Sequence, residues 1–361
     1  MIAWLRTLMR LRAERRPLVV VTVVRVKGSA PREPGAKMLV EPDALHGTIG
    51  GGNLELTAVR IARAMLAPRL AGTPAAATTL RRFPLGATLG QCCGGAVDLL
   101  FEPLPFDALD RDAGDWIDAL AQGQQQAQPR VLVRPAGGLR GSGGVVVAKD
   151  AVQGELDEAA VAHARRLLVD GRADARVIDI PVGERAAARV FEVVAPPDLR
   201  IVLFGAGHVG RALVGALAAL DCDLTWVDDR EAAFPPTIPE HVGAVATDTP
   251  AACVDEAAPG TCFLVMTYSH ALDLELAERV LRRRDFRYLG VIGSATKRRR
   301  FEQRLALRGF DPAALARMRC PIGIAGIDSK EPAAIAIAVA AELLQVRERV
   351  CEPAMLPFIP A

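Results

Sequence analysis

Short apolar runs and stretches of helical periodicity alternate along the whole chain. The spacing of apolar residues over 2–11 predicts an amphipathic helix, and the β-branched run 18–26 predicts a buried strand after it. Further strands are expected where short apolar runs lie between turn residues, at 37–41, 96–102, 131–134, 144–148 and 189–194. Helices are expected where apolar residues recur at helical spacing, at 54–66, 107–121 and 159–170. The segments 131–134 and 144–148 are expected to pair as a hairpin, and the glutamine-rich segment 122–128 to form a polar bridge.

A more regular pattern begins after a proline-containing linker. Ala195-Pro-Pro-Asp198 breaks both helix and strand. Beyond it, strands are expected at 200–204, 224–227, 262–267 and 288–292, and helices at 211–220, 272–283, 296–307 and 332–346. Such alternation predicts a parallel sheet with helices on both faces. We therefore expect an α/β protein: an N-terminal mixed α/β domain, 1–195, followed by a C-terminal Rossmann-like domain with a doubly wound parallel sheet, 199–361.

A glycine-rich turn joins the first strand and the first helix of the second half. Gly205, Gly207 and Gly210 have the G-x-G-x-x-G spacing, and Asp228 ends the next predicted strand. In dinucleotide-binding folds such glycines allow a tight turn and the approach of a pyrophosphate, and the acidic residue binds a ribose hydroxyl. The pattern indicates a site for NAD(P) or another nucleotide. The alternative is a turn that is kept for packing alone.

A second glycine-rich turn precedes the helix predicted at 54–66. Gly50, Gly51 and Gly52 are followed by Asn53, a favourable N-cap, and Glu55 complements the helix dipole in the first turn. Free backbone amides and the dipole would both favour an anion at this place. The alternative is a tight strand-to-helix turn without a ligand.

Lysine is rare in this chain, in which arginine supplies most of the 44 basic residues. Lys297 follows Gly293-Ser-Ala-Thr at another predicted strand-to-helix turn. Lysine is a compact point charge suited to phosphate, so we expect Lys297 to contact a bound cofactor. Chance placement near glycine is the alternative.

Two adjacent cysteines, Cys92 and Cys93, lie between glycines in the segment Leu89-Gly-Gln-Cys-Cys-Gly-Gly95. Glycine lets the backbone turn sharply and approach a ligand, and a thiol at such a turn stays accessible. We interpret the pair as lining a ligand pocket. Burial in the core is the alternative, since cysteine is among the most buried residue types. A zinc half-site or a structural disulfide is less consistent with the spacing.

The totals exclude several classes of function. A net charge of +2 and 4% aromatic residues give no case for nucleic-acid binding. Seven cysteines without framework spacing indicate a reducing compartment. Arg15-Arg16 resembles a twin-arginine signal, but the apolar run after it is short and meets Arg25. No apolar run is long enough for a membrane span, so we expect a cytoplasmic protein.

Taken together, these motifs resemble the XdhC/CoxI family, the accessory proteins that mature xanthine dehydrogenase and related molybdenum hydroxylases. The motifs that carry the resemblance cover nearly the whole chain and are Gly28–Arg32, Gly47–Glu55, Gly90–Gly95, Phe204–Gly210, Gly290–Lys297 and Pro321–Pro332. The adjacent cysteine pair is similar to that of the xanthine dehydrogenase branch of the family.

The resemblance implies a chaperone rather than an enzyme. Such a protein binds molybdenum cofactor (molybdopterin), holds it while a separate cysteine desulfurase supplies the terminal sulfur, and passes it to apo-xanthine dehydrogenase. The resemblance also implies a homodimer. No catalytic residue is assigned to this chain.

The implied roles of single residues follow from the chemistry of that cofactor. The amides at Gly50–Asn53 would hold its phosphate, with Lys37 or Arg32 neutralising the charge. Cys92 or Cys93 would contact molybdenum, because thiolates suit soft metal centres. Gln91 would contact the pterin.

Two other classes of protein stay open. One is an NAD(P)-dependent oxidoreductase that uses the turn at Gly205–Gly210 and Asp228. The other is a thiol-redox or metal-trafficking protein that uses Cys92 and Cys93, although adjacent cysteines form strained disulfides. Mass spectrometry of the gently purified protein would separate the three by the bound species: a pterin, a nicotinamide or a bare metal.

Overall fold

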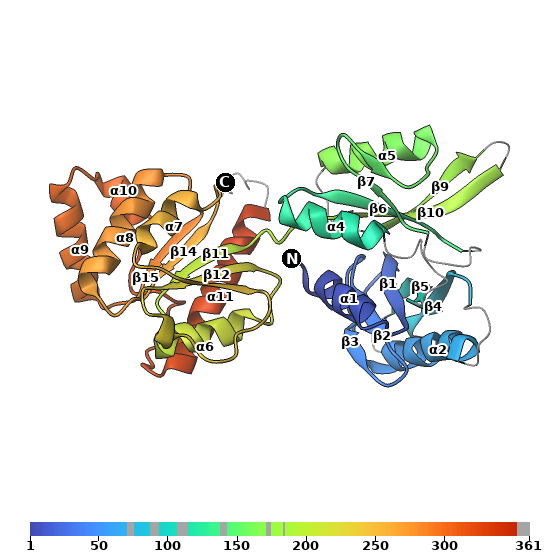
Figure 1. The fold of residues 1–361 in the computed structure, drawn as a ribbon, viewed down its shortest axis with the longest axis horizontal. Coiled ribbons are helices and arrows are strands. Elements are labelled where there is room, and N and C mark those ends of the chain that lie inside the picture. The colour runs from blue at the N-terminus through green and yellow to red at the C-terminus, as the bar shows by residue number, and fades with distance from the viewer. Residues whose placement is uncertain are drawn as a thin grey trace, which may run out of the picture. The chain divides into compact units, whose positions relative to one another are not determined.

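The computed structural model describes residues 1–70, 76–86, 94–106, 115–137, 143–170, 175–182 and 185–351 (Figure 1). Contacts within the chain divide it into two compact units, Met1–Pro196 and Pro197–Ala361. The described part of the first unit contains two antiparallel sheets, and the second unit contains a parallel one. Within these ranges no helix combines the length and apolar character that crossing a membrane requires.

The first sheet of unit 1 has a buried strand, β1 (Leu18–Lys27), at its centre. In the order β3-β2-β1-β5-β4, it consists of β1, β2 (Lys37–Val40), β3 (Leu45–Gly47), β4 (Thr79–Pro84) and β5 (Ala96–Leu104). Helix α2 (Gly52–Leu70) packs on one face, against Val19 and Val21 of β1. Helix α1 (Ala3–Ala13) packs on the other face, against Val20. Because both faces are covered, residues 18–24 of β1 are all buried and nearly all apolar, and the predicted helix and strand are both confirmed.

The second sheet of unit 1 shares a core with the first. In the order β8-β7-β6-β10-β9, it consists of β6 (Arg130–Pro135), β7 (Val145–Val147), β8 (Val152–Gln153), β9 (Ala175–Val182) and β10 (Arg185–Val194). Helix α5 (Glu158–Asp170) covers one face. Helix α4 (Asp115–Gln125) lies with α1 in the core that both sheets contribute to. The predicted hairpin of β6 and β7 is confirmed.

The glutamine-rich segment 122–128 differs from its prediction, because its first half belongs to α4. Helix α4 continues through Gln125, so the expected polar bridge at 122–128 is largely helical. Gln124 is buried, accepts a hydrogen bond from the Ile2 amide (3.2 Å) and donates one to the Ala195 carbonyl (2.9 Å). A glutamine that satisfies two distant backbone groups behaves as a core residue, although its type suggests a surface.

Four charged side chains form a buried network between the two sheets. Lys37 from β2 pairs with Glu192 from β10. Arg134 from β6 contacts Glu192 at 2.6 Å and Glu102 from β5 at 2.5 Å. Burial lowers the pKa of the Lys37 ammonium and raises the pKa of the Glu102 carboxyl. The network ties the sheets together by ion pairs that are hidden from solvent.

Unit 2 is built on a six-stranded parallel sheet in the order β13-β12-β11-β14-β15-β16. Its strands are β11 (Arg200–Phe204), β12 (Asp223–Asp228), β13 (Val242–Ala246), β14 (Cys262–Val265), β15 (Tyr288–Val291) and β16 (Met318–Arg319). Helices α6 (His208–Leu217) and α11 (Pro332–Cys351) cover one face. The other face is covered by α7 (Pro250–Glu256), α8 (His270–Arg283), α9 (Ala295–Leu307) and α10 (Pro312–Ala316). This strand order confirms the predicted Rossmann-like, doubly wound sheet.

The strands missing from the sequence prediction are mostly at sheet edges. β4, β8, β9, β13 and β16 each lie at one end of a sheet in the strand order. Where their side chains are described, many are exposed or half-buried, as in β4 and β13. Edge strands need no continuous apolar run, so the pattern used to predict central strands does not detect them.

Candidate functional site

Three of the glycine-rich loops in unit 1 lie in direct contact. A methyl group built on Gly50 would overlap the ring of Pro31, and one built on Gly95 would overlap the carbonyl oxygens of Lys27 and Ser29. The loop that contains Gly28–Arg32 therefore touches both the turn before α2 and the residues that lead into β5. Only glycine permits such close approach, which explains Gly50 and Gly95.

The turn before α2 already holds an anion, which is the side chain of Glu55. The Oε2 atom of Glu55 accepts hydrogen bonds from the amides of Ile49 and Gly51, each at 3.1 Å, and from the Thr48 hydroxyl. The Gly50 amide donates to Thr48 Oγ1 at 3.0 Å. The chain thus places its own carboxylate where the sequence predicts an anion-binding turn.

The start of α2 differs by two residues from the prediction. The helix begins at Gly52, so Asn53 lies within its first turn and is not the N-cap. Gly50, Gly51 and Gly52 all have positive φ, of 119°, 74° and 63°. Three successive residues in that left-handed region require glycine, because a Cβ would clash with the backbone there.

The two cations expected near a phosphate are placed differently. Lys37 is buried in the ion-pair network between the sheets, where Glu192 neutralises it. Arg32 lies beside Gly50 and is half-exposed, with an ion pair to Glu33 at 3.2 Å. Arg32 is thus the cation that the structure places next to the glycine turn.

Gln91, Cys92 and Cys93 lie outside the described residues. The flanks of their segment are described: the Leu85 amide donates to the Gly95 carbonyl at 2.9 Å, and Gly95 contacts the loop at 27–29. In the described ranges, no group of three histidine, cysteine or acidic side chains could hold a metal ion.

In unit 2, the three glycines of the G-x-G-x-x-G turn have three different surroundings. A methyl group on Gly205 would overlap the Met266 carbonyl, and one on Gly210 would overlap the Gly205 carbonyl. A methyl group on Gly207 would meet no heavy atom within 4 Å. Gly207 is also the N-cap of α6, and no side chain caps that turn. Gly205 and Gly210 therefore serve packing, and the backbone at Gly207 faces open space.

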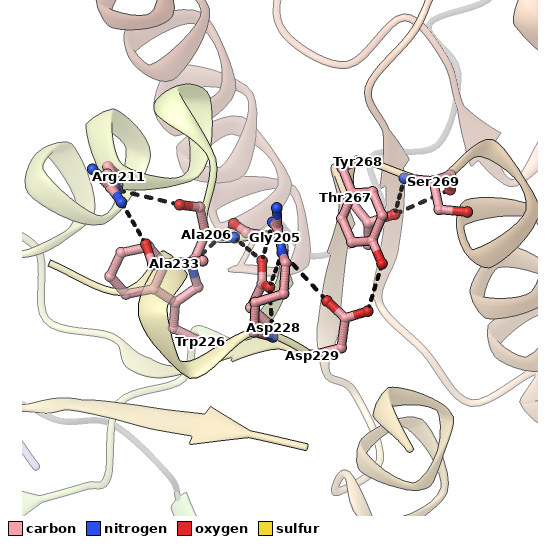
Figure 2. Close-up of polar contacts among 11 residues, drawn as sticks. Gly205, Ala206, Arg211, Trp226, Asp228, Asp229, Ala233, Thr267, Tyr268 and Ser269 are labelled. Carbon is pink, nitrogen blue, oxygen red and sulfur yellow. Dashed lines mark hydrogen bonds and ion pairs between the residues drawn. The ribbon is translucent and has the colours of Figure 1, made fainter. Parts of the chain in front are cut away.

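Asp228 holds the glycine-rich turn in place. Its Oδ2 accepts a hydrogen bond from the Ala206 amide at 2.6 Å, and Arg230 binds both of its carboxylate oxygens (Figure 2). Burial alone would raise the pKa of Asp228, but the hydrogen bonds from Arg230 and the Ala206 amide outweigh it and lower that pKa. Asp228 is thus an ionised carboxylate with both oxygens engaged.

Two residues that the sequence prediction missed lie next to Asp228. The Tyr268 hydroxyl donates to Asp229 Oδ2 at 2.8 Å (Figure 2). The Arg230 guanidinium lies 4.2 Å from the centre of the Tyr268 ring. The charged sequence Asp228-Asp229-Arg230 directly after a strand was the available signal for Arg230. For Tyr268 the available signal was its position directly after the strand predicted at 262–267, at the carboxyl edge of the sheet.

Lys297 reaches the same edge of the sheet but points into the protein. Its Nζ donates to Asp273 Oδ2 at 2.5 Å and to the Ile292 carbonyl at 2.7 Å. Asp273 Oδ1 in turn accepts from the Thr267 hydroxyl at 2.7 Å. Lys297 therefore connects the turn after β15 to the start of α8, and its charge is neutralised within the protein.

Comparisons with known proteins match both halves of the chain. A model described as the XdhC and CoxI family matches residues 11–81, and a model described as the XdhC Rossmann domain matches residues 201–343. An Escherichia coli K12 protein, the uncharacterised protein YqeB, is 29% identical over 223 residues, which are 60% of this chain. The aligned region spans only 40% of the length of that relative. A crystal structure from Bacillus halodurans, described as a xanthine dehydrogenase, has the same fold: the TM-score is 0.72 over 98% of each chain, at 22% identity.

Proposed function

This chain belongs to the XdhC and CoxI family, and from that premise we propose that it is an accessory protein of a xanthine dehydrogenase. In this proposal it binds molybdenum cofactor, protects it while a cysteine desulfurase supplies the terminal sulfur, and delivers it to the apo-dehydrogenase. The chain acts as a homodimeric chaperone and catalyses no step itself.

The observation that carries the proposal is the contact among the three glycine-rich loops of unit 1. The loop at 28–32 touches Gly50 on one side and Gly95 on the other, and Gly95 flanks the segment that contains Cys92 and Cys93. The motifs on which the family resemblance rests in this half of the chain therefore meet at one place. A cofactor with a phosphate, a pterin and soft sulfur ligands needs several different contact groups in such proximity.

The residues of the turn before α2 fit a phosphate group. The amides of Ile49 and Gly51 converge on one carboxylate oxygen of Glu55, and this convergence supports an anion-binding role for the turn. A phosphate would take the place of that carboxylate, and Arg32 would supply the opposing charge beside Gly50. Gly52 and Asn53 follow in the first turn of α2, next to this turn.

The cysteines would supply the contact to the metal. When bound, the cofactor supplies the molybdenum centre whose terminal ligand is exchanged. Cys92 or Cys93 would offer a thiolate to that soft centre, and Gln91 an amide to the edge of the pterin. The neighbouring glycines would let the backbone close around the group and exclude water.

The proposal is tested by replacing Cys93 with alanine in the full chain. After expression in cells that make the cofactor, we expect the variant to lose most of its bound molybdenum and pterin and to leave the partner dehydrogenase without sulfurated cofactor. Molybdenum is measured by elemental mass spectrometry, and the pterin by fluorescence after oxidation. Cys253→Ala, which changes a half-buried thiol in unit 2, is the matched control and should retain the wild-type content.

Two outcomes of that experiment would contradict the proposal. One is a Cys93→Ala variant with an unchanged molybdenum and pterin content. The other is a variant with a much lower melting temperature than Cys253→Ala, because Cys93 would then be a core residue.

The alternative function is that of an NAD(P)-dependent oxidoreductase. It is favoured by one observation, the open backbone at Gly207 in a strand–turn–helix of the right order. Against it, the charged groups Asp228, Asp273 and Lys297 are bound to one another or to neighbours in the described structure. To test this alternative, the purified chain is mixed with NAD(P) and then with hypoxanthine or another small reductant. A change in the absorbance of the nicotinamide would support an oxidoreductase.

A further inference from the structure

The loops after β12 and β14 lie on either side of the glycine-rich turn. Both strands pair with β11, β12 on one side and β14 on the other. A contact between their loops must therefore cross the carboxyl end of β11, where Gly205 begins the turn. In open α/β sheets this is the switch point of the strand order, at which ligands bind.

Such a contact is present and is made by four side chains, Asp228, Asp229, Arg230 and Tyr268, which we call the clasp. Tyr268 follows β14, yet its hydroxyl bonds to Asp229 and its ring lies against Arg230, both of which follow β12 (Figure 2). Arg230 is fixed by Asp228, at 2.9 and 3.1 Å. The clasp thus joins the two loops across the end of β11.

A small cavity, of about 10 Å³, adjoins the two aspartates of the clasp. It is lined by the ends of the three strands and the segments next to them, including Phe204, Asp229 and Thr267. That volume holds one water molecule. By contrast, the space in front of Gly207 and the uncapped N-terminus of α6 is open. A phosphate group can therefore approach the turn, while the clasp bridges the two loops on either side of it.

We propose that the clasp is an autoinhibitory contact that closes a nucleoside diphosphate site in unit 2. When Tyr268 swings away, the turn at Gly207 receives the diphosphate, and the Arg230 guanidinium offers its freed face to the purine base. Tyr268 is 62% exposed, so it can leave without unpacking the core. The inference rests on residues of unit 2 alone and does not depend on molybdenum cofactor.

The experiment measures binding of ADP by calorimetry to four forms of the full chain: wild type, Tyr268→Phe, Tyr268→Ala, and Tyr268→Ala combined with Gly207→Val. We expect Tyr268→Ala to bind ADP about tenfold more tightly than the wild type. A ligand that binds only the open form has an apparent affinity proportional to the fraction of molecules that are open, and the substitution raises that fraction. Tyr268→Phe, which keeps the ring and loses the hydrogen bond, should lie between them. The added valine at Gly207 should abolish the gain, because it fills the space for the diphosphate.

A matched control and a measurement without ligand accompany the titrations. Arg282→Ala removes an arginine stacked on Phe310 elsewhere in unit 2 and should leave ADP binding as in the wild type. Without ADP, hydrogen exchange of the amides at 205–211 should be faster in Tyr268→Ala than in the wild type, because the clasp holds Asp228 and Asp228 holds the Ala206 amide.

Three results would overturn the proposal. If neither the wild type nor Tyr268→Ala binds ADP, the crevice is no nucleotide site and the clasp serves stability alone. If Tyr268→Ala binds ADP more weakly than the wild type, Tyr268 is a ligand contact. If Arg282→Ala gains as much affinity as Tyr268→Ala, the gain is unrelated to the clasp.

Discussion

Among single side chains, the ionisation of Tyr268 can be measured most directly, because the chain contains only two tyrosines. The hydrogen bond to Asp229, and then the charge of that carboxylate, raise the pKa of Tyr268 above its ordinary value. The other tyrosine, Tyr288, is buried, and burial raises its pKa much further. The first tyrosine to ionise in an alkaline titration is therefore the one in the clasp.

Replacing Asp229 with asparagine should lower the pKa of Tyr268. The group is protonated in the clasp, so its hydrogen bond is present at neutral pH and is lost as the pH rises through the raised pKa. Ultraviolet difference titration measures the phenolate directly, and Tyr268→Phe should eliminate this first transition. An Asp229→Asn titration that overlays the wild-type curve would show that Asp229 does not bind Tyr268 in solution.

At the level of helices and strands, the turn from β11 to α6 separates packing glycines from an accessible one. A methyl group on Gly210 would overlap the Gly205 carbonyl, which also accepts a hydrogen bond from Trp226 Nε1 at 3.0 Å. Gly210→Ala should therefore destabilise the protein by about 1–3 kcal/mol, as overpacking typically does. Urea denaturation measures the difference. Gly207→Ala is the matched control, since its methyl group meets no atom within 4 Å, and an equal loss in both variants would refute the assignment.

The same turn shows how much of the structure the sequence could predict. Residues 200–228 combine apolar periodicity, glycine spacing and an acidic strand end, so strand, turn, helix and the position of Asp228 were all predictable. Edge strands such as β13 were not, because half-exposed strands lack an apolar run. Within the site, local sequence does not encode pairs between distant segments. Lys297 was recognised as a special residue, but its partner Asp273 and the stacking of Tyr268 on Arg230 depend on which strands are neighbours.

Across unit 1 as a whole, the two sheets are joined both by a shared apolar core and by a buried network of charges. The network consists of Lys37, Glu192, Arg134 and Glu102. Each sheet supplies charges of both signs: Lys37 and Glu102 come from the first, Arg134 and Glu192 from the second. A buried charge that loses its partner destabilises a protein strongly, so the packing of the two sheets that brings these charges together is favoured over packings that separate them. The network therefore makes the stability of one sheet depend on the presence of the other.

Removing Glu192 tests that dependence. Glu192→Ala leaves Lys37 without its carboxylate in a buried place, which should cost about 3–5 kcal/mol of unfolding free energy. Unit 1 can be followed alone in a Trp226→Phe background, because the two remaining tryptophans, Trp4 and Trp116, both lie in it, and Lys37 Nζ is 4.9 Å from the Trp4 ring. The control is Glu14→Ala, which breaks the ion pair with Arg10 on α1 in unit 1. Both side chains of that pair are about 40% exposed, so the change should cost about 0–1 kcal/mol. If Glu192→Ala shifts the tryptophan fluorescence transition no more than Glu14→Ala does, the apolar core joins the two sheets without help from the buried charges.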